Sequence, residues 1–463
     1  MCGVNMVNFN EVAIRAETGT MMAEQDFDMN KVARKAAELR KEIDFKFDPK
    51  EIVNTDMSLA DELWEAGLKL FLETGVYSTR TRRVITFDES EVKHALKNAR
   101  DRLEVGQGKD KRILYNRGIN DNRPPIVFGG PFNCDVSEDM FVRFNEAYAR
   151  EEIIDLLFLP GYLKTIHGLD IRPDSGLSGK TVILYARWSR EAIERAGRPG
   201  LAIVGHGIMG LNEIGVTNEE WGLRRTDPRA MVMLPELKVD DVTLSRLGYY
   251  SMYGAPLYIA FTPLVGGFAG GPESTAIVSV ANHIGALMLG ADIIHMGPQH
   301  IRYRHQTNPH SLWVANRVKQ AITRNTKMIH LTSHTTAGRT GSEQYAYEFA
   351  TLELTVVPSG SHIAGPRPAD LKFDNHNSPL MARLFGEIGH ATAKLKLEET
   401  NDMILTLLEK YKDRMDFESA PIGKPFEELY DVNTLKPTKE HYEMYLKVKK
   451  ELIDLGLELE MDY

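Results

Sequence analysis

The sequence predicts an α/β protein built on a (β/α)8 TIM barrel, with an N-terminal helical extension and C-terminal helices. From about Pro124 onward, short apolar runs lead into glycines and then into helical patterns, and this unit recurs roughly seven or eight times. The runs are apolar throughout, as in a parallel sheet that helices cover. So many units favour a closed barrel over an open doubly wound sheet.

Residues 1–123 are expected to form the mainly helical extension. Apolar residues recur at helical spacing over 28–43, 59–73 and 89–103, with polar residues on the other face. The alternating stretch RRVITF, at 82–87, predicts a short strand or hairpin.

Residues 124–397 are expected to form the barrel, and residues 398–463 to add helices packed on it. The predicted strands are the apolar runs, at 125–131, 153–161, 200–207, 256–267, 291–298, 328–335 and 352–360. Helical patterns such as ESTAIVSVANHIGALMLG separate them. Because such barrels place their chemistry at the carboxyl ends of the strands, the polar residues and glycines that follow these runs indicate where a site would lie.

Composition excludes several classes of protein. The 463 residues include 56 Lys and Arg against 65 Asp and Glu, a net charge of −9, which argues against a nucleic-acid-binding protein. Cys2 and Cys134 are the only cysteines, too few for a disulfide framework or a cysteine-rich zinc site, and they fit a reducing compartment. With no recognisable signal peptide and no long apolar window, we expect a cytoplasmic protein with no membrane partner.

The stretch LAIVGHGIMG, at 201–210, has the spacing G-x-G-x-x-G directly after an apolar run. A dinucleotide-binding turn would continue into a helix and then a strand that ends on an acidic residue. The sequence instead continues LNEIGVTNEEWGLRRTDPRA, whose Asp227 lies in a turn-like stretch. We therefore favour a glycine-rich loop at the barrel mouth over a nicotinamide site.

Histidines gather at the ends of the predicted strands, where they could act as acids or bases, bind a metal, or only line the barrel mouth. They are His206, His295, His300, His305, His330 and His334. No pair falls on a predicted helix at zinc-binding spacing, so no metal site is assigned. In GPQHIRYRHQTN, at 297–308, two arginines join two of these histidines, a cluster that suits a phosphate or carboxylate as well as a solvated loop.

Aromatic residues concentrate between 249 and 268. They could bind a quaternary ammonium group, although core packing is the commoner role of such residues. The group consists of Tyr249, Tyr250, Tyr253, Tyr258, Phe261 and Phe268. Paired glycines in VGGFAGGPEST, at 265–275, would let a flat ligand or another backbone approach closely.

Read together, these motifs resemble the monomethylamine methyltransferase family of methanogenic archaea. The resemblance spans nearly the whole chain and rests on TGVYSTRTRRV, PIVFGGP, AGRPGLAIVG, LPELKVD, GGFAGGPEST, GPQHIR and SAPIGKPFEELYDVNTLKPT. It implies a (β/α)8 barrel that forms homohexamers and transfers a methyl group from methylamine to the Co(I) centre of a separate corrinoid protein. The corrinoid (cobalamin) is then carried by that partner, and this chain holds no covalently bound cofactor.

Members of this family carry pyrrolysine in the segment that matches AGRPGLAIVG. The resemblance places that position at Val204, so this chain lacks pyrrolysine. By the same matching, two family glutamates fall at Ala230 and Ala260, a glutamine falls near Thr332, and an aromatic residue falls near His334. Pyrrolysine chemistry is therefore expected to be absent.

Without pyrrolysine, a small methylated substrate must already be activated, because a neutral amine is a poor leaving group. A quaternary ammonium or sulfonium leaves as a neutral molecule, and an uncharged aromatic pocket suits such a cation. We expect that pocket to be lined by Val204, Ala230, Tyr258, Ala260, Phe261 and Thr332. A second option uses His206 and His334, the expected catalytic residues, which could protonate a leaving group or bind a metal that does.

The retained motifs suggest that the barrel mouth still faces the corrinoid protein. The candidate corrinoid-facing residues are Gly266, Gly267, Glu273, His300 and Arg302. Two alternatives stay open. One is a catalytically silent homologue with a binding or regulatory role, and the other is a histidine- or metal-dependent enzyme that moves methyl groups from oxygen or sulfur.

Overall fold

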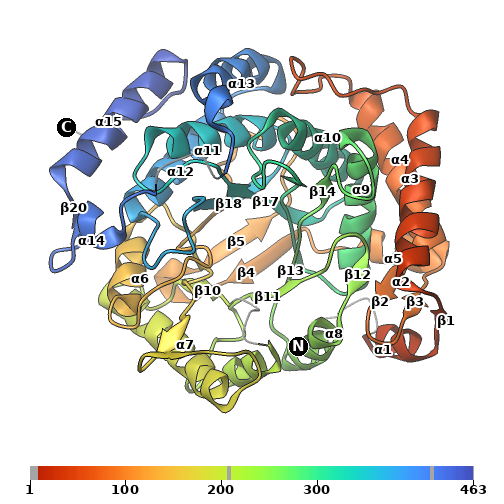
Figure 1. The fold of residues 1–463 in the computed structure, drawn as a ribbon, viewed down its shortest axis with the longest axis horizontal. Coiled ribbons are helices and arrows are strands. Elements are labelled where there is room, and N and C mark those ends of the chain that lie inside the picture. The colour runs from red at the N-terminus through yellow and green to blue at the C-terminus, as the bar shows by residue number, and fades with distance from the viewer. Residues whose placement is uncertain (1–8, 206–209, 418–421, 462–463) are drawn as a thin grey trace.

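Eight parallel strands form the barrel at the centre of the protein (Figure 1). The computed structural model describes residues 9–205, 210–417 and 422–461. In the order in which they neighbour one another, the strands are β10 (Ala202–Val204), β7 (Leu156–Phe158), β6 (Val127–Gly129), β18 (His362–Arg367), β17 (Ile329–Thr335), β15 (Ile293–Met296), β13 (Leu257–Phe261) and β11 (Arg229–Val232). The predicted (β/α)8 barrel is confirmed.

A backbone bridge closes the ring between β10 and β11. Gly205, directly after β10, pairs in parallel with Arg229. The amide of Ala230 donates to the carbonyl of Gly205 at 2.9 Å, and the amide of Gly205 donates to the carbonyl of Pro228 at 3.2 Å. A Cβ atom on Gly205 would overlap Cδ1 of Leu223, so a larger residue there would require the Leu223 side chain to shift.

Helices surround the barrel, because the outward side chains of its strands are largely apolar and need a cover. In chain order they are α6 (Phe141–Arg150), α7 (Gly176–Arg195), the 3-10 segment η4 (Gly210–Thr217), α8 (Asp241–Tyr253), α9 (Pro272–Met288), α10 (Pro309–Asn325), α11 (Glu343–Val356) and α12 (Pro379–Thr392). Helices α9, α10 and α11 are themselves covered from outside by further helices. Most residues of α9, α10 and α11 are therefore buried.

Two barrel strands differ from the prediction. The run 352–360 is predicted as a strand, but its first residues form the last turns of α11, which ends at Val356. That prediction is wrong. A helix buried on all sides lacks the polar stripe that would identify it in sequence. The sequence patterns missed β11 and β18, because RAMV begins with a charged residue and HIAGPR contains glycine and proline.

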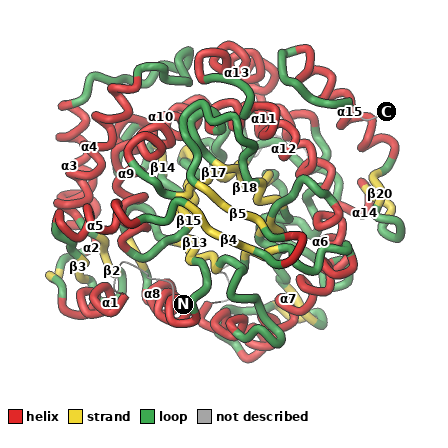
Figure 2. Tube along the Cα trace, turned by 180° about the vertical axis from the view of Figure 1, so that it is seen from behind, coloured by secondary structure: helices red, strands yellow, loops and turns green. Residues whose placement is uncertain are grey.

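Alternate residues of the barrel strands point inward and pack as one cluster. The strands contribute Phe128, Leu156, Phe158, Ala202, Val204, Ala230, Tyr258, Ile293, Ile329, Leu331 and Ala364. A hairpin of β4 (Arg102–Val105) and β5 (Arg112–Tyr115) lies across one end of the barrel (Figure 2) and adds Leu103, Val105 and Leu114. The Gln107 amide of this hairpin donates to the Gly200 carbonyl, just before β10, at 2.8 Å. The hairpin therefore fills the amino-terminal end and leaves the carboxyl end for a ligand.

The N-terminal extension is attached to the barrel at several places. Helix α4 packs on α9 and α10, and Gly67 lies so close to Val280 that a Cβ atom would not fit. Strand β2 (Val76–Ser78) pairs in parallel with β12 (Lys238–Val239). The helical segments of the extension are α1 (Phe9–Thr18), α2 (Glu24–Asp26), the π-helical η1 (Phe27–Ala33), α3 (Arg34–Leu39), η2 (Arg40–Glu42), α4 (Met57–Thr74) and α5 (Glu89–Asn98).

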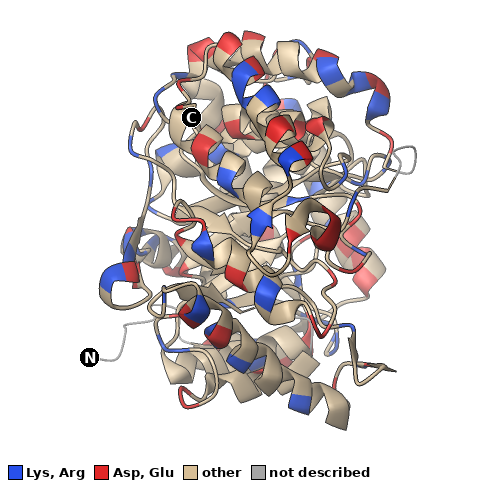
Figure 3. Ribbon diagram, turned by 90° about the vertical axis from the view of Figure 1, so that its left-hand side faces the viewer, with Lys and Arg blue, Asp and Glu red and all other residues tan. Residues whose placement is uncertain are grey.

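The C-terminal helices complete the outer layer. Helix α13 (Leu397–Tyr411) packs on α11, and α15 (Lys439–Asp454) packs on α11 and α12. Basic and acidic residues are interspersed on the outer helices in the side view of Figure 3. Within the described ranges, every helix is too short or too polar to span a lipid bilayer. The boundaries at 123/124 and 397/398 stay predictions.

The hairpin at the amino-terminal end offers a matched pair of substitutions. Leu114 is fully buried, whereas the neighbouring Ile113 is 37% exposed. We expect Leu114→Ala to lower the free energy of unfolding by about 2–5 kcal/mol, because it leaves a cavity in the barrel interior. Ile113→Ala is expected to cost less than about 1 kcal/mol. Denaturant unfolding of both variants measures this, and equal losses would show that the hairpin does not fill the barrel.

Candidate active site

A cavity of about 240 Å³ lies at the carboxyl ends of the barrel strands. An apolar cavity of about 150 Å³ accommodates benzene, so this one has room for a somewhat larger molecule. Its lining comes from the ends of β11, β13, β15, β17 and β18 and from the segments after β6 and β7. The lining residues are Phe132, Asn133, Leu159, Ala230, Met231, Val232, Tyr258, Ala260, Phe261, Thr262, His295, Gln299, Gln306, Ser333, Thr335 and Arg367.

Small residues keep one side of the cavity open. Ala230 of β11 and Ala260 of β13 both line it, and in the register of these strands Ala230 lies opposite Tyr258 and Val232 opposite Ala260. Val232 is half exposed at the rim. Among the residues that the structure describes, the lining contains no aspartate or glutamate.

Aromatic rings form another part of the wall. The ring centroids of Phe132 and Phe158 are 4.8 Å apart, and those of Phe158 and Tyr258 are 5.9 Å apart. The His295 ring lies 5.6 Å from that of Tyr258 and 6.2 Å from that of Phe132. Such rings offer electron-rich faces to a cation.

Tyr258 and His295 form a hydrogen-bonded pair, with 2.6 Å between the Tyr258 hydroxyl and Nδ1 of His295. Burial lowers the pKa of His295 to about 3, so the ring is neutral near pH 7. Nε2 of His295 is buried and has no hydrogen-bond partner among the described residues. The pair can therefore offer a ligand one further hydrogen bond from this nitrogen.

The polar side of the cavity is built around Gln306 and Arg367. The Gln306 side-chain oxygen accepts from the Ser333 hydroxyl and from the Thr335 amide, both at 3.0 Å. The Arg367 guanidinium carbon lies 5.6 Å from the centroid of the Phe132 ring. Burial lowers the pKa of Arg367, although an arginine keeps its charge.

The structure brings together four of the six residues predicted to line the substrate pocket, namely Ala230, Tyr258, Ala260 and Phe261. Val204 is fully buried in the same interior cluster as Ala230, beside Phe158 of β7, and is not part of the lining. Thr332 points toward Ser361, with 2.9 Å between their hydroxyl oxygens.

His334 lies outside the cavity. Its ring packs against Phe385 of α12 with centroids 4.8 Å apart, and Nδ1 is 3.1 Å from the Thr332 carbonyl oxygen. Burial lowers its pKa to about 3. This position gives no geometric support to the proton-transfer role predicted for His334. His206, the other predicted catalytic residue, falls outside the described residues.

The predicted corrinoid-facing residues lie around two loops beyond the barrel strands. Strand β14 (Leu264–Val265) pairs in parallel with β16 (Gln299–His300), which joins the loops after β13 and β15. Gly266, at φ +83, turns the first loop, and the Gly267 amide donates to the Leu264 carbonyl at 3.0 Å. Because Gln299 also lines the cavity, these loops form part of its rim.

The side chains of the predicted corrinoid-facing residues have different surroundings. Arg302 is exposed beside the Tyr303 ring, whereas the His300 ring lies 5.0 Å from that of His310. Burial lowers the pKa of His300. Glu273, at the start of α9, accepts from the Phe47 amide at 3.1 Å and thereby holds the N-terminal extension.

Several lining residues were absent from the predicted pocket. Arg367 was missed together with its strand, and Phe132 lies in a loop whose position no periodicity indicates. His295 lies near the end of a predicted strand and Gln306 follows the same strand, and this position is the sequence feature that could have identified them. The sequence does not distinguish inward from outward side chains there.

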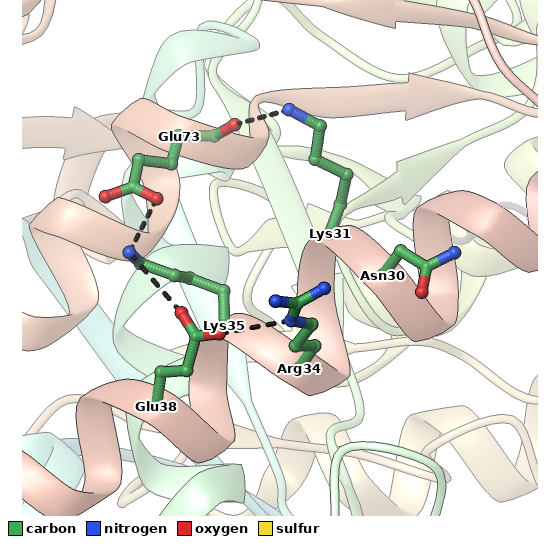
Figure 4. Close-up of a pocket in the computed structure, with 6 residues that line it drawn as sticks. All are labelled: Asn30, Lys31, Arg34, Lys35, Glu38 and Glu73. Carbon is green, nitrogen blue, oxygen red and sulfur yellow. Dashed lines mark hydrogen bonds and ion pairs between the residues drawn. The ribbon is translucent and has the colours of Figure 1, made fainter.

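A second, open pocket lies on the N-terminal helices (Figure 4), lined by Asn30, Lys31, Arg34, Lys35, Glu38 and Glu73. Its charges pair with one another: Lys35 lies 2.8 Å from Glu73, and Arg34 lies 3.1 Å from Glu38. The Lys35–Glu73 pair joins α3 to the end of α4, whereas Arg34 and Glu38 both belong to α3. Among the described residues, no three His, Cys, Asp or Glu side chains are grouped to hold a metal ion.

Comparison with known proteins adds an independent finding. The family model described as "Monomethylamine methyltransferase MtmB" matches residues 7–457. Monomethylamine methyltransferase MtmB2 of Methanosarcina acetivorans and MtmB1 of Methanosarcina barkeri are each 31% identical over 449 residues, 96% of this chain and 96% of each relative. The crystal structure of the Methanosarcina barkeri enzyme superposes with a TM-score of 0.92 at 30% identity, covering 97% of this chain and 98% of that one. The hydroxylamine complex of MtmB gives the same values.

Buried histidines predict how stability depends on pH. The pKa of His334 falls from 6.5 to about 3 on folding, so the unfolded chain binds the extra proton and folding stability is lost as pH falls below 6.5. Six other buried histidines have lowered pKa values, and three buried glutamates with raised pKa values only partly offset them. The free energy of unfolding should therefore decrease from pH 6.5 downward.

His334→Gln tests the contribution of one histidine. It should flatten that decrease by about 1.4 kcal/mol per pH unit. Urea unfolding at a series of pH values measures the slope, with the exposed His94→Gln as the control that leaves it unchanged. An unchanged slope in His334→Gln would mean that His334 is charged in the folded protein.

Proposed function

The chain belongs to the monomethylamine methyltransferase MtmB family, and from this premise we propose that it is a corrinoid-dependent methyltransferase that works without pyrrolysine. In this proposal the methyl donor is a quaternary or otherwise activated N-methyl compound, and the acceptor is the Co(I) centre of a corrinoid protein. Monomethylamine itself would be a poor donor.

The observation that carries the proposal is the chemistry of the cavity lining. Ala230 and Ala260, which the family resemblance matches to glutamates, line a cavity whose described residues include no carboxylate. A primary ammonium group would find hydrogen-bond acceptors in this lining but no counter-charge among the described residues. A quaternary nitrogen has no N–H bonds, and its methyl groups can pack against alanines and aromatic faces.

The chemistry follows from the charge on nitrogen. As the methyl group passes to Co(I), the C–N bond breaks and nitrogen keeps the bonding electron pair, so a quaternary ammonium departs as a neutral tertiary amine. No proton is needed in that step. The residues of this chain then act by binding and orientation: Tyr258 and Phe132 hold the cation, and the apolar wall excludes water.

We propose that the rim formed by β14 and β16 faces the corrinoid protein. Gly266 and Gly267 would let a flat macrocycle or another backbone approach closely, and the exposed Arg302 would meet a polar group of the partner. Glu273 and His300 would support these loops from below. We also retain homohexameric assembly and a cytoplasmic location as parts of the proposal.

A methyl-transfer assay tests the proposal directly. The protein is mixed with a reduced Co(I) corrinoid, free or protein-bound, and the absorbance change on cobalt methylation is followed. Glycine betaine, choline and related quaternary compounds are compared with the methylamines. We expect methylation from a quaternary donor and not from monomethylamine. Methylation by monomethylamine, or by no donor at all, would contradict the proposal.

Filling the cavity should abolish transfer without unfolding the protein. Ala260→Leu adds three carbon atoms at the cavity wall, so we expect kcat/KM for the quaternary donor to fall at least about tenfold, a loss of about 1.4 kcal/mol of transition-state binding. Ala23→Leu, at an exposed alanine of the N-terminal extension, is the matched control. Full activity in Ala260→Leu with a normal melting temperature would place the donor elsewhere.

A further inference from the structure

We infer that the methyl donor also carries a carboxylate, and that Arg367 binds it across the cavity from Ala230 and Ala260. The donor would then be a zwitterion, an N-methylated amino acid of the betaine type. This inference rests on the proposed function and specifies its substrate class.

Arg367 is a partly exposed cation that has no counter-charge among the described residues. It lines the cavity, Nε is buried with no hydrogen-bond partner, and no described carboxylate lies within ion-pair distance of the guanidinium. The titratable groups that act on its charge are Cys134 and Tyr345, and both are neutral because burial raises their pKa values well above the usual range. A carboxylate on a bound ligand would supply the missing counter-charge.

Three buried arginines of this chain pair with groups of the protein, although Nε of Arg229, like that of Arg367, is buried without a hydrogen-bond partner among the described residues. Arg246 donates to the Glu213 carboxylate at 2.7 Å, and Arg198 lies 3.3 Å from Asp110. Arg229 donates to two backbone carbonyl oxygens, at 2.7 and 2.8 Å. Arg367 differs from these residues in facing a cavity, where an external carboxylate could accept from it in the two-pronged geometry that guanidinium favours.

The order of strands separates the two ends of the proposed ligand. In the eight-stranded ring, β18 with Arg367 lies four positions from β11 with Ala230, so the two residues come from opposite sides of the barrel. The carboxylate would lie at the β18 side and the methylated nitrogen at the β11 and β13 side. A cavity of about 240 Å³ is large enough for both groups.

Charge balance favours a zwitterion over a simple cation. His295 is neutral and the described lining has no carboxylate, so the fixed charge among the described lining residues is that of Arg367. A ligand with only a quaternary nitrogen would place two positive charges in one buried space. A carboxylate on the same ligand pairs with Arg367 and removes this repulsion.

Calorimetric titration without corrinoid tests the inference. Glycine betaine and choline share the trimethylammonium group, and only the first carries a carboxylate. We expect glycine betaine to bind at least about tenfold more tightly than choline, since a charge-assisted hydrogen-bonded pair contributes about this much or more. Equal affinity of the two compounds, or stronger binding of choline, would overturn the inference.

Substitution of Arg367 identifies the group responsible. Arg367→Gln should weaken glycine betaine binding about ten- to a hundredfold and leave choline binding unchanged or improved. Arg187→Gln removes the same charge from the exposed face of α7 and should change neither affinity. Equal weakening of both ligands in Arg367→Gln would assign the arginine a structural role and overturn the inference.

The melting temperature of the ligand-free protein supplies a second readout. Because Arg367→Gln removes a charge that no described carboxylate balances, its melting temperature should equal or exceed that of the unsubstituted protein. A marked decrease would show that Arg367 supports the fold, which contradicts the inference.

The binding and methyl-transfer experiments can refute the proposed activity and the inference independently of each other. Arg367-dependent binding of glycine betaine without cobalt methylation would retain the inference and refute the proposed activity. Methyl transfer from choline and glycine betaine with equal efficiency would retain the activity and refute the inference.

Discussion

The closed ring of backbone hydrogen bonds is the constraint on which the rest of the structure depends. Closure through Gly205 and Arg229 leaves no free strand edge and sends every second side chain into one narrow interior. That interior is filled at the amino-terminal end by the β4–β5 hairpin, and side chains become smaller and more polar toward the other end. The cavity is thus the part of the barrel that the protein's own side chains do not fill.

Sequence patterns were sufficient for the architecture because the strand–helix units are long and apolar. They failed where an element lacked its usual signature, as in RAMV of β11 and HIAGPR of β18, or where a helix was buried on all sides, as in α11. The site shows a different limit. Along β17, Ser333 and Thr335 line the cavity while Thr332 and His334 point into the helical layer, and no pattern reveals which parity faces inward when both sides are buried.

The family relationship and the cavity chemistry answer different questions. A TM-score of 0.92 to the Methanosarcina barkeri structure establishes the shared frame. The ligand is selected by the few side chains that this frame presents, and here these are alanines, aromatic rings, a neutral histidine and one arginine. Because they come from several strands and loops, a single substitution can change the charge or size of the cavity while leaving the other elements in place.

The contact between Phe47 and Glu273 joins residues 226 positions apart and has a consequence for biosynthesis. A ribosome that adds about 5–20 residues per second needs roughly 10–45 seconds to pass from one to the other. During that interval the N-terminal helices have been made, but the surfaces of α9 and α10 that cover their apolar faces have not. The extension therefore emerges first and docks late, so the nascent chain displays exposed apolar helices of the kind that chaperones bind until most of the barrel has been translated.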